Sequence, residues 1–68
     1  MRYKVCYKSV SGHCCFEASI LDMEVKDEAG YYDNLGEFFN KEVAEKVCGL
    51  FNGGGFEVTD KIREEVTE

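Results

Sequence analysis

Residues 40–55, NKEVAEKVCGLFNGGG, decide the fold, because this segment contains a complete helix with both of its ends marked. Asn40 is a preferred residue type at a helix N-cap, where its side chain accepts a hydrogen bond from a backbone N–H of the first turn. Asn52 and Gly53 tolerate the left-handed conformation that commonly ends a helix, and two further glycines oppose its continuation. The sequence therefore predicts a helix over about residues 41–52.

One side of this helix is apolar. At about 100° per residue, six of its side chains fall on one broad arc: Val43, Ala44, Val47, Cys48, Leu50 and Phe51. The charged side chains lie on the other side. A helix of about three turns is marginal alone in water, so its apolar arc requires a partner surface, and we expect that surface to be a sheet.

Two segments near the N-terminus alternate apolar and polar residues with the period of a strand. They form a hairpin over residues 2–22, with its turn at Ser11-Gly12. Pairing Val10 with His13 predicts a register that brings both apolar faces together. In that register Tyr7 lies opposite Phe16, Val5 opposite Ala18, and Tyr3 opposite Ile20.

The remaining segments extend the sheet. Tyr31–Phe39 has the aromatic content of a third strand, with a bulge indicated near Gly36. Residues 56–58 fit a short fourth strand, whereas Asp60, Ile62 and Val66 fit one or two turns of helix, and the sequence leaves both interpretations open.

We therefore predict a single α+β domain over residues 1–68, with a three- or four-stranded antiparallel sheet and one helix packed on one face. The expected core is Tyr3, Val5, Tyr7, Phe16, Ala18, Ile20, Val43, Val47, Leu50 and Phe51. The helix then acts as the lid of the core, and the back of the sheet and the acidic loop before the third strand remain free to bind.

Composition excludes several classes of function. The net charge of −6 opposes direct binding to nucleic acid, and no apolar run approaches the length that crosses a membrane. The N-terminus lacks a secretory signal pattern, so we expect a cytoplasmic protein with its four cysteines as thiols. A chain of 68 residues forms only a small core, which is compatible with a homodimer.

From Leu35 to Asn52 the sequence LGEFFNKEVAEKVCGLFN resembles an element of small bacteriophage and mobile-element accessory proteins. In these proteins a short antiparallel sheet ends in an aromatic pair, followed by a helix of the form FF-N-x-E-x-A-x-x-V-x-x-L-x-N. The resemblance covers about a quarter of the chain, and its residues are structural. It implies an inhibitor of a host protein or defence complex, of the anti-CRISPR type, and it supplies no catalytic residues.

Cys6, His13 and Cys15 share the outer face of the predicted hairpin and provide a candidate metal- or thiol-based module. The paired C-x-x-C spacing of structural zinc sites is missing, and the triglycine follows a helix instead of preceding one, unlike a phosphate-binding loop. We therefore expect no enzyme, no catalytic residues, no metal and no cofactor, and keep the thiol module as an alternative.

Residues 17–37 contain seven acids against one lysine. This stretch is either a solvated edge that discourages aggregation or a recognition surface for a basic partner. We favour recognition of a basic surface on a host protein or complex, with a self-associating structural subunit as a further alternative. The predicted partner-binding residues are Asp22, Glu24, Asp27, Glu28, Tyr31, Tyr32 and Asp33.

Overall fold

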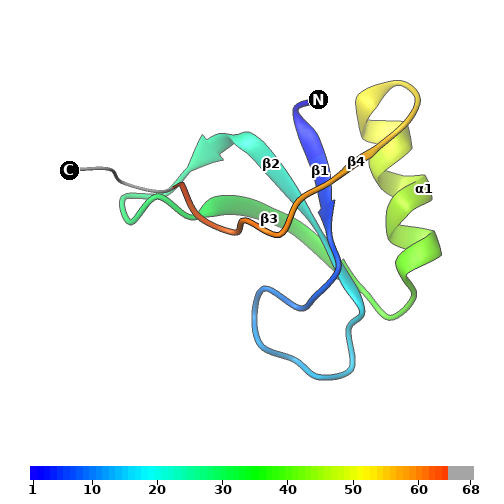
Figure 1. Ribbon diagram of the computed structural model, residues 1–68, viewed down its shortest axis with the longest axis horizontal. Helices are drawn as coiled ribbons and strands as arrows, with labels where there is room; N and C mark the ends of the chain where they lie inside the picture. Colours follow the sequence, from blue (N-terminus) through cyan, green and yellow to red (C-terminus); the bar gives the residue numbers. More distant parts are fainter. Residues whose placement is uncertain (65–68) are drawn as a thin grey trace.

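The computed structural model describes residues 1–64. Its elements in chain order are β1 (Tyr3–Cys6), β2 (Ala18–Lys26), β3 (Tyr32–Phe38), α1 (Lys41–Asn52) and β4 (Glu57–Val58). The four strands form one sheet in the order β3-β2-β1-β4, and α1 packs against its first three strands (Figure 1). The predicted α+β fold with one helix is confirmed. The sheet is mixed, because β4 pairs with β1 in parallel, while the other two pairs are antiparallel.

Helix α1 begins and ends where the sequence predicts. The Asn40 side chain accepts a hydrogen bond of 2.8 Å from the backbone N–H of Glu42. At the other end Gly53 adopts a φ of 75°, and the N–H of Gly54 donates to the carbonyl of Gly49 over 2.8 Å. Local capping chemistry therefore sets both ends of the helix.

The part of the helix that faces the sheet differs from the prediction. Ala44 and Cys48 are buried against Val5, Ala18 and Ile20, with Val47 at the margin. The larger side chains of the arc are turned out, with exposed fractions of 46% for Val43, 80% for Leu50 and 50% for Phe51. These three were wrongly expected in the core. The two smallest side chains of the arc let α1 approach the sheet closely, and the contact is too narrow to cover the whole arc.

The side chain of Asn52 fixes the end of α1 to the start of β1. Its carbonyl oxygen accepts from the N–H of Tyr3 over 3.1 Å, and its amide group donates to the carbonyl of Tyr3 over 2.9 Å. The same amide group donates to the carbonyl of Gly55 over 3.2 Å. One half-buried side chain thus satisfies backbone groups of both the strand and the glycine turn.

The register of the first hairpin is shifted by two residues from the prediction. Tyr3 lies opposite Asp22, Val5 opposite Ile20, and Cys6 opposite Ser19. Because side chains alternate with a period of two, this shift leaves the same residues facing the helix. The faces were therefore predicted correctly and the pairing was not.

The shift arises because residues 7–17 form a long loop, not a tight turn. The Glu37 carboxylate of β3 accepts hydrogen bonds from the hydroxyls of Ser9 (2.7 Å) and Ser11 (2.6 Å) and from the Ser11 N–H (2.9 Å). These bonds hold the loop against the sheet in place of further strand pairing. Tyr7 is exposed and Phe16 is half-buried, so neither belongs to the core as predicted.

The C-terminal segment covers the back of the sheet, which we expected to be free. The N–H of Thr59 donates to the carbonyl of Val5 over 2.8 Å, and further along the chain the N–H of Tyr32 donates to the carbonyl of Ile62 over 3.0 Å. Residues 59–64 therefore run from the β1 side of the sheet to the start of β3 (Figure 1). Beneath this segment and the 7–17 loop, Cys6, Ser19 and Leu21 are buried.

The predicted alternatives for the C-terminus are partly resolved. Residues 57–58 form the short strand β4, and Asp60 and Ile62 lie in an extended segment with no helical turn. Val66, which belonged to the helical interpretation, lies outside the described residues.

Two of the glycines near the end of α1, Gly49 and Gly53, give opposite predictions for stability. Gly53→Ala should lower the free energy of unfolding by about 1 kcal/mol, because Gly53 has a φ of 75° that a Cβ disfavours. Gly49→Ala should raise it by about 0.5–1 kcal/mol, because Gly49 lies inside the helix and the new Cβ would lie 3.6 Å from the nearest atom, the Gly55 nitrogen. Urea denaturation measures the change in the free energy of unfolding for both variants. Changes of the same sign in the two variants would contradict the described helix end.

Candidate functional site

Strands β2 and β3 separate at the end of the sheet that carries the acidic loop. Asp22 pairs with Asp33 and Lys26 pairs with Tyr32, so residues 23–25 of β2 have no partners on β3. Such an insertion bends a strand and turns its extra residues outward. Glu24 and Val25 are exposed as a result.

The loop between the two strands is held by Asp27. One oxygen of its carboxylate accepts hydrogen bonds of 2.9 Å from the backbone N–H groups of both Ala29 and Tyr31. The Asp27 N–H donates to the Tyr31 carbonyl over 2.9 Å, and Gly30 adopts a φ of 89° at the turn. Asp27 therefore shapes the loop, and the neighbouring side chains are presented from a fixed backbone.

The side chains of this region form what we call the acidic end. It comprises the exposed acids Glu24, Asp27, Glu28 and Asp33 with the adjacent Tyr31 and Tyr32. Within residues 1–64 the carboxylates of Glu28 and Asp33 have no hydrogen-bond or ion-pair partner. A shallow pocket of about 370 Å³ lies between the strands. Its lining residues are Val25, Lys26, Asp27, Tyr31, Tyr32, Asp33 and Asn34.

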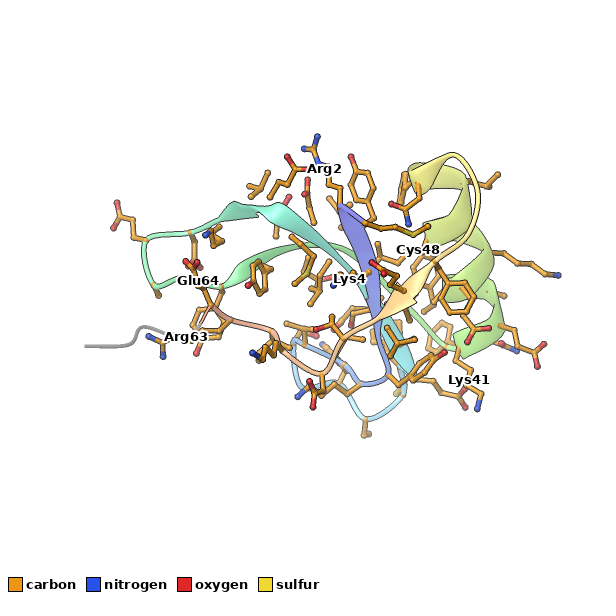
Figure 2. All side chains as sticks on the ribbon, turned by 45° about the horizontal axis from the view of Figure 1, so that its top comes forward. Arg2, Lys4, Lys41, Cys48, Arg63 and Glu64 are labelled. Carbon is orange, nitrogen blue, oxygen red and sulfur yellow. The ribbon has the colours of Figure 1, made fainter. Side chains whose placement is uncertain are left out.

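The acidic end already holds cationic side chains of the chain itself: the Arg2 guanidinium lies 3.8 Å from the Glu24 carboxylate, and Arg63 lies over Tyr31. The guanidinium carbon of Arg63 lies 5.5 Å from the centre of the Tyr31 ring, within the range of a cation–π contact. Next to it, the Lys26 ammonium lies 2.8 Å from the Glu64 carboxylate, and this hydrogen bond raises the pKa of Lys26. Figure 2 shows Arg63 and Glu64 at the end of the sheet far from α1.

Asp22 was predicted to contact a partner, but its carboxylate is engaged inside the protein. It is buried and accepts two parallel hydrogen bonds of 3.0 Å from the Arg2 guanidinium, plus one of 3.0 Å from the N–H of Glu24. The bond to Arg2 is the main reason that the pKa of Asp22 is lowered. Asp22 thus supports the bend in β2 and is not available on the surface. The other six predicted residues lie together at the acidic end.

The candidate thiol cluster is not assembled as predicted. Cys6 is buried in β1, where desolvation raises the pKa of its thiol, while Cys14 and Cys15 are exposed in the long loop. His13 packs edge-on against Phe16, with the ring centres 5.7 Å apart. Among residues 1–64 there is no group of three or more His, Cys, Asp or Glu side chains arranged to hold a metal ion.

A second hollow lies between the long loop and the start of α1, and sequence reasoning did not anticipate it. It is lined in part by Tyr7, Lys8, His13, Phe16 and Lys41. Two lysines and the acid Glu17 line this hollow, and no buried polar side chain of the described residues points into it without a partner.

Sequence reasoning also missed Val25, Lys26 and Arg63 at the acidic end. Val25 is exposed in the bulge of β2, which no local residue pattern indicates. Arg63 lies 32 residues from Tyr31 in the chain, and only the path of the C-terminal segment brings the two together.

Comparisons with known proteins do not narrow the choice of function: the chain matches no protein-family model, no curated protein and no solved structure. No helix in the described part of the chain is long and apolar enough to span a membrane.

The ion pair of Asp22 predicts how stability depends on pH. Because the pKa of Asp22 is lower in the folded state, the unfolded chain binds a proton first in acid, and stability falls as the pH drops below the ordinary aspartate value of about 4. Asp22→Asn should lower the free energy of unfolding at pH 7 and make its decrease at acid pH smaller. The pKa values of Glu37 and Glu57 are also lowered, so part of the acid dependence should remain.

Urea denaturation at a series of pH values measures this effect. Glu28→Gln is the control, because it removes one exposed carboxylate that has no partner in residues 1–64. This variant should lose stability at acid pH to the same extent as the wild type. An Asp22→Asn variant with the full acid dependence of the wild type would show that the Arg2 pair contributes nothing to it.

Proposed function

We propose that this chain is a small, non-enzymatic interaction protein whose acidic end binds a basic surface of a partner protein. The observation that carries the proposal is the contact between Arg63 and Tyr31, with a distance of 5.5 Å from the guanidinium to the ring centre. A place where an aromatic ring beside several exposed carboxylates already accepts a guanidinium has the chemistry to accept one from another protein.

The geometry of the acidic end supports this proposal. Residues 22–33 contain five acids and one lysine, and that lysine is paired with Glu64. The carboxylates of Glu28 and Asp33 therefore face solvent without a compensating cation in the described chain. Exposed charge of one sign beside tyrosines is typical of interfaces that attract a partner electrostatically and anchor it through aromatic contacts.

The rigidity of the loop is a second support. Its backbone is fixed by the bonds to the Asp27 carboxylate and by the pairing of Tyr31 with Arg63. A loop that is ordered before binding loses less conformational entropy when the partner arrives. Arg63 occupies part of the surface, so a partner arginine would either displace it or bind beside it in the pocket.

The partner that we propose is a protein of a host cell, and the site of action is the host cytosol. The resemblance of residues 35–52 to phage accessory proteins supports an inhibitor that blocks a host complex, including a defence complex of the CRISPR type. A complex that handles nucleic acid carries basic grooves, and an acidic protein of this size suits occupation of such a groove. Direct binding of this chain to nucleic acid is disfavoured by its net charge of −6.

Charge reversal at the acidic end tests the proposal. The tagged protein is used to capture partners from a bacterial lysate at low salt, and the affinity for the captured protein is then measured across a salt series. The double variant Glu28→Lys, Asp33→Lys should weaken binding by about tenfold or more and reduce its dependence on salt. Asp27 is left unchanged because its carboxylate holds the loop.

The matched control is Glu17→Lys, Asp60→Lys, which changes the net charge equally but lies outside the acidic end. We expect this control to retain most of the wild-type affinity. Equal losses in both double variants would mean that only net charge matters, and failure to capture any protein at low salt would contradict the proposal.

A further inference from the structure

Residues 62–64 of the C-terminal segment pair with the acidic end like a short added strand, and we call them the strap. Arg63 of the strap forms an isolated antiparallel bridge with Tyr31. Backbone hydrogen bonds of 3.0 and 2.9 Å join the strap to the residues on either side of Tyr31 and so flank this pair. The pair itself is therefore of the non-hydrogen-bonded kind, in which opposite side chains lie closest together.

Two side chains of the strap occupy groups that a basic partner would use. The Arg63 guanidinium carbon lies 5.5 Å from the centre of the Tyr31 ring, and the Glu64 carboxylate lies 2.8 Å from the Lys26 ammonium. Tyr31 and Lys26 both line the shallow pocket of the acidic end. Figure 2 shows both strap side chains at this end of the sheet. A partner guanidinium that uses the same face of Tyr31 must therefore displace Arg63.

The contacts that hold the strap are individually weak. Arg63 and Glu64 are exposed, and Ile62 is half-buried. An exposed cation–π contact and an exposed ion pair each contribute little, and exposed backbone bonds open at a small cost in free energy. Just before the strap, the N–H of Thr59 donates to the carbonyl of Val5 over 2.8 Å, which ties the segment to β1. The strap is thus a tethered ligand that can leave the acidic end and return to it.

We infer that the strap is an autoinhibitory contact: the partner binds by supplying an extended segment that takes the place of the strap, with an arginine on the Tyr31 ring. This role of the strap rests on the function proposed above and adds the kind of segment that the partner supplies. An extended segment gains main-chain hydrogen bonds at a sheet edge, and β3 is an edge strand. Arginine is favoured over lysine because its planar guanidinium stacks on a ring. The Asp27 carboxylate still holds the loop when the strap leaves.

A peptide exchange experiment tests the strap without any partner protein. The probe is an acetylated and amidated peptide with the sequence of residues 59–64, TDKIRE, titrated into the full isotope-labelled chain while NMR follows the backbone amides of residues 30–32. Arg63→Ala, Glu64→Ala removes both side-chain anchors of the strap without changing the net charge. This variant should bind the peptide about tenfold more tightly than the wild type, because its own strap competes less. Both side chains are exposed, so the circular dichroism spectrum should not change.

Two controls isolate the strap. Glu42→Ala, Lys46→Ala removes an exposed acid and an exposed base from α1, also without changing the net charge, and should bind the peptide as the wild type does. A peptide with alanine in place of its arginine should bind the Arg63→Ala, Glu64→Ala variant several-fold more weakly than TDKIRE. Equal affinity of TDKIRE for this variant and the wild type, no detectable binding to the variant, or NMR shifts that avoid residues 30–32 would overturn the inference.

Affinity for the captured partner separates the role of the strap from the proposed function. Arg63→Ala should strengthen partner binding several-fold, whereas Lys46→Ala, which makes the same change in net charge on α1, should change it less. If Glu28→Lys, Asp33→Lys weakens binding but Arg63→Ala brings no gain over Lys46→Ala, the acidic end is the binding site and the autoinhibitory role of the strap is wrong. Peptide exchange at residues 30–32 without capture of any partner would contradict the proposed function alone.

Discussion

Helix α1 meets the sheet through Ala44 and Cys48, the two smallest apolar side chains of its arc, and the rest of the structure depends on this close contact. Short side chains bring the helix backbone near β1, where the Asn52 amide bonds both the N–H and the carbonyl of Tyr3. The larger apolar side chains cannot fit between two surfaces that lie so close. Val43 and Leu50 are therefore left exposed on the outer side of the helix, while Phe51 packs at the margin against the Tyr3 ring.

The covering of both faces of the sheet determines where binding can occur. Helix α1 covers one face, and residues 59–64 with the long loop cover the other, so that Val5 and Cys6 are buried on opposite sides of β1. The sheet offers no broad open face within residues 1–64. The acidic end of the β2–β3 connection and the exposed outer side of α1 lie at opposite ends of the molecule.

Local chemistry made part of the fold predictable. The helix ends follow from Asn40 and Gly53, whose capping roles depend only on their immediate neighbours. The alternation in β1 and β2 gave the correct faces, but the pairing was wrong by two residues. The bonds that Glu37 makes to Ser9 and Ser11 stabilise the longer loop, and those residues are more than 25 positions apart in the chain.

Other features depend on contacts that a sequence pattern does not contain. Helical periodicity defines an apolar arc, but it does not say which part of that arc meets the sheet, so Leu50 and Phe51 were misplaced in the core. The acidic end was located from its run of acids, yet the burial of Asp22 under Arg2 follows from β1 lying beside β2. The contact of Arg63 with Tyr31 likewise requires the C-terminal segment to cross the sheet.

The rate at which Cys48 is alkylated in the native protein, relative to Cys14, tests the central contact most directly. Cys48 is buried against the sheet and burial raises the pKa of its thiol, whereas Cys14 is exposed in the long loop. Pulse labelling with N-ethylmaleimide, followed by mass spectrometry of peptides, should show Cys14 reacting about a hundredfold or more faster than Cys48. Equal rates in the folded protein would contradict the account, because α1 would then not meet the sheet through its smallest side chains.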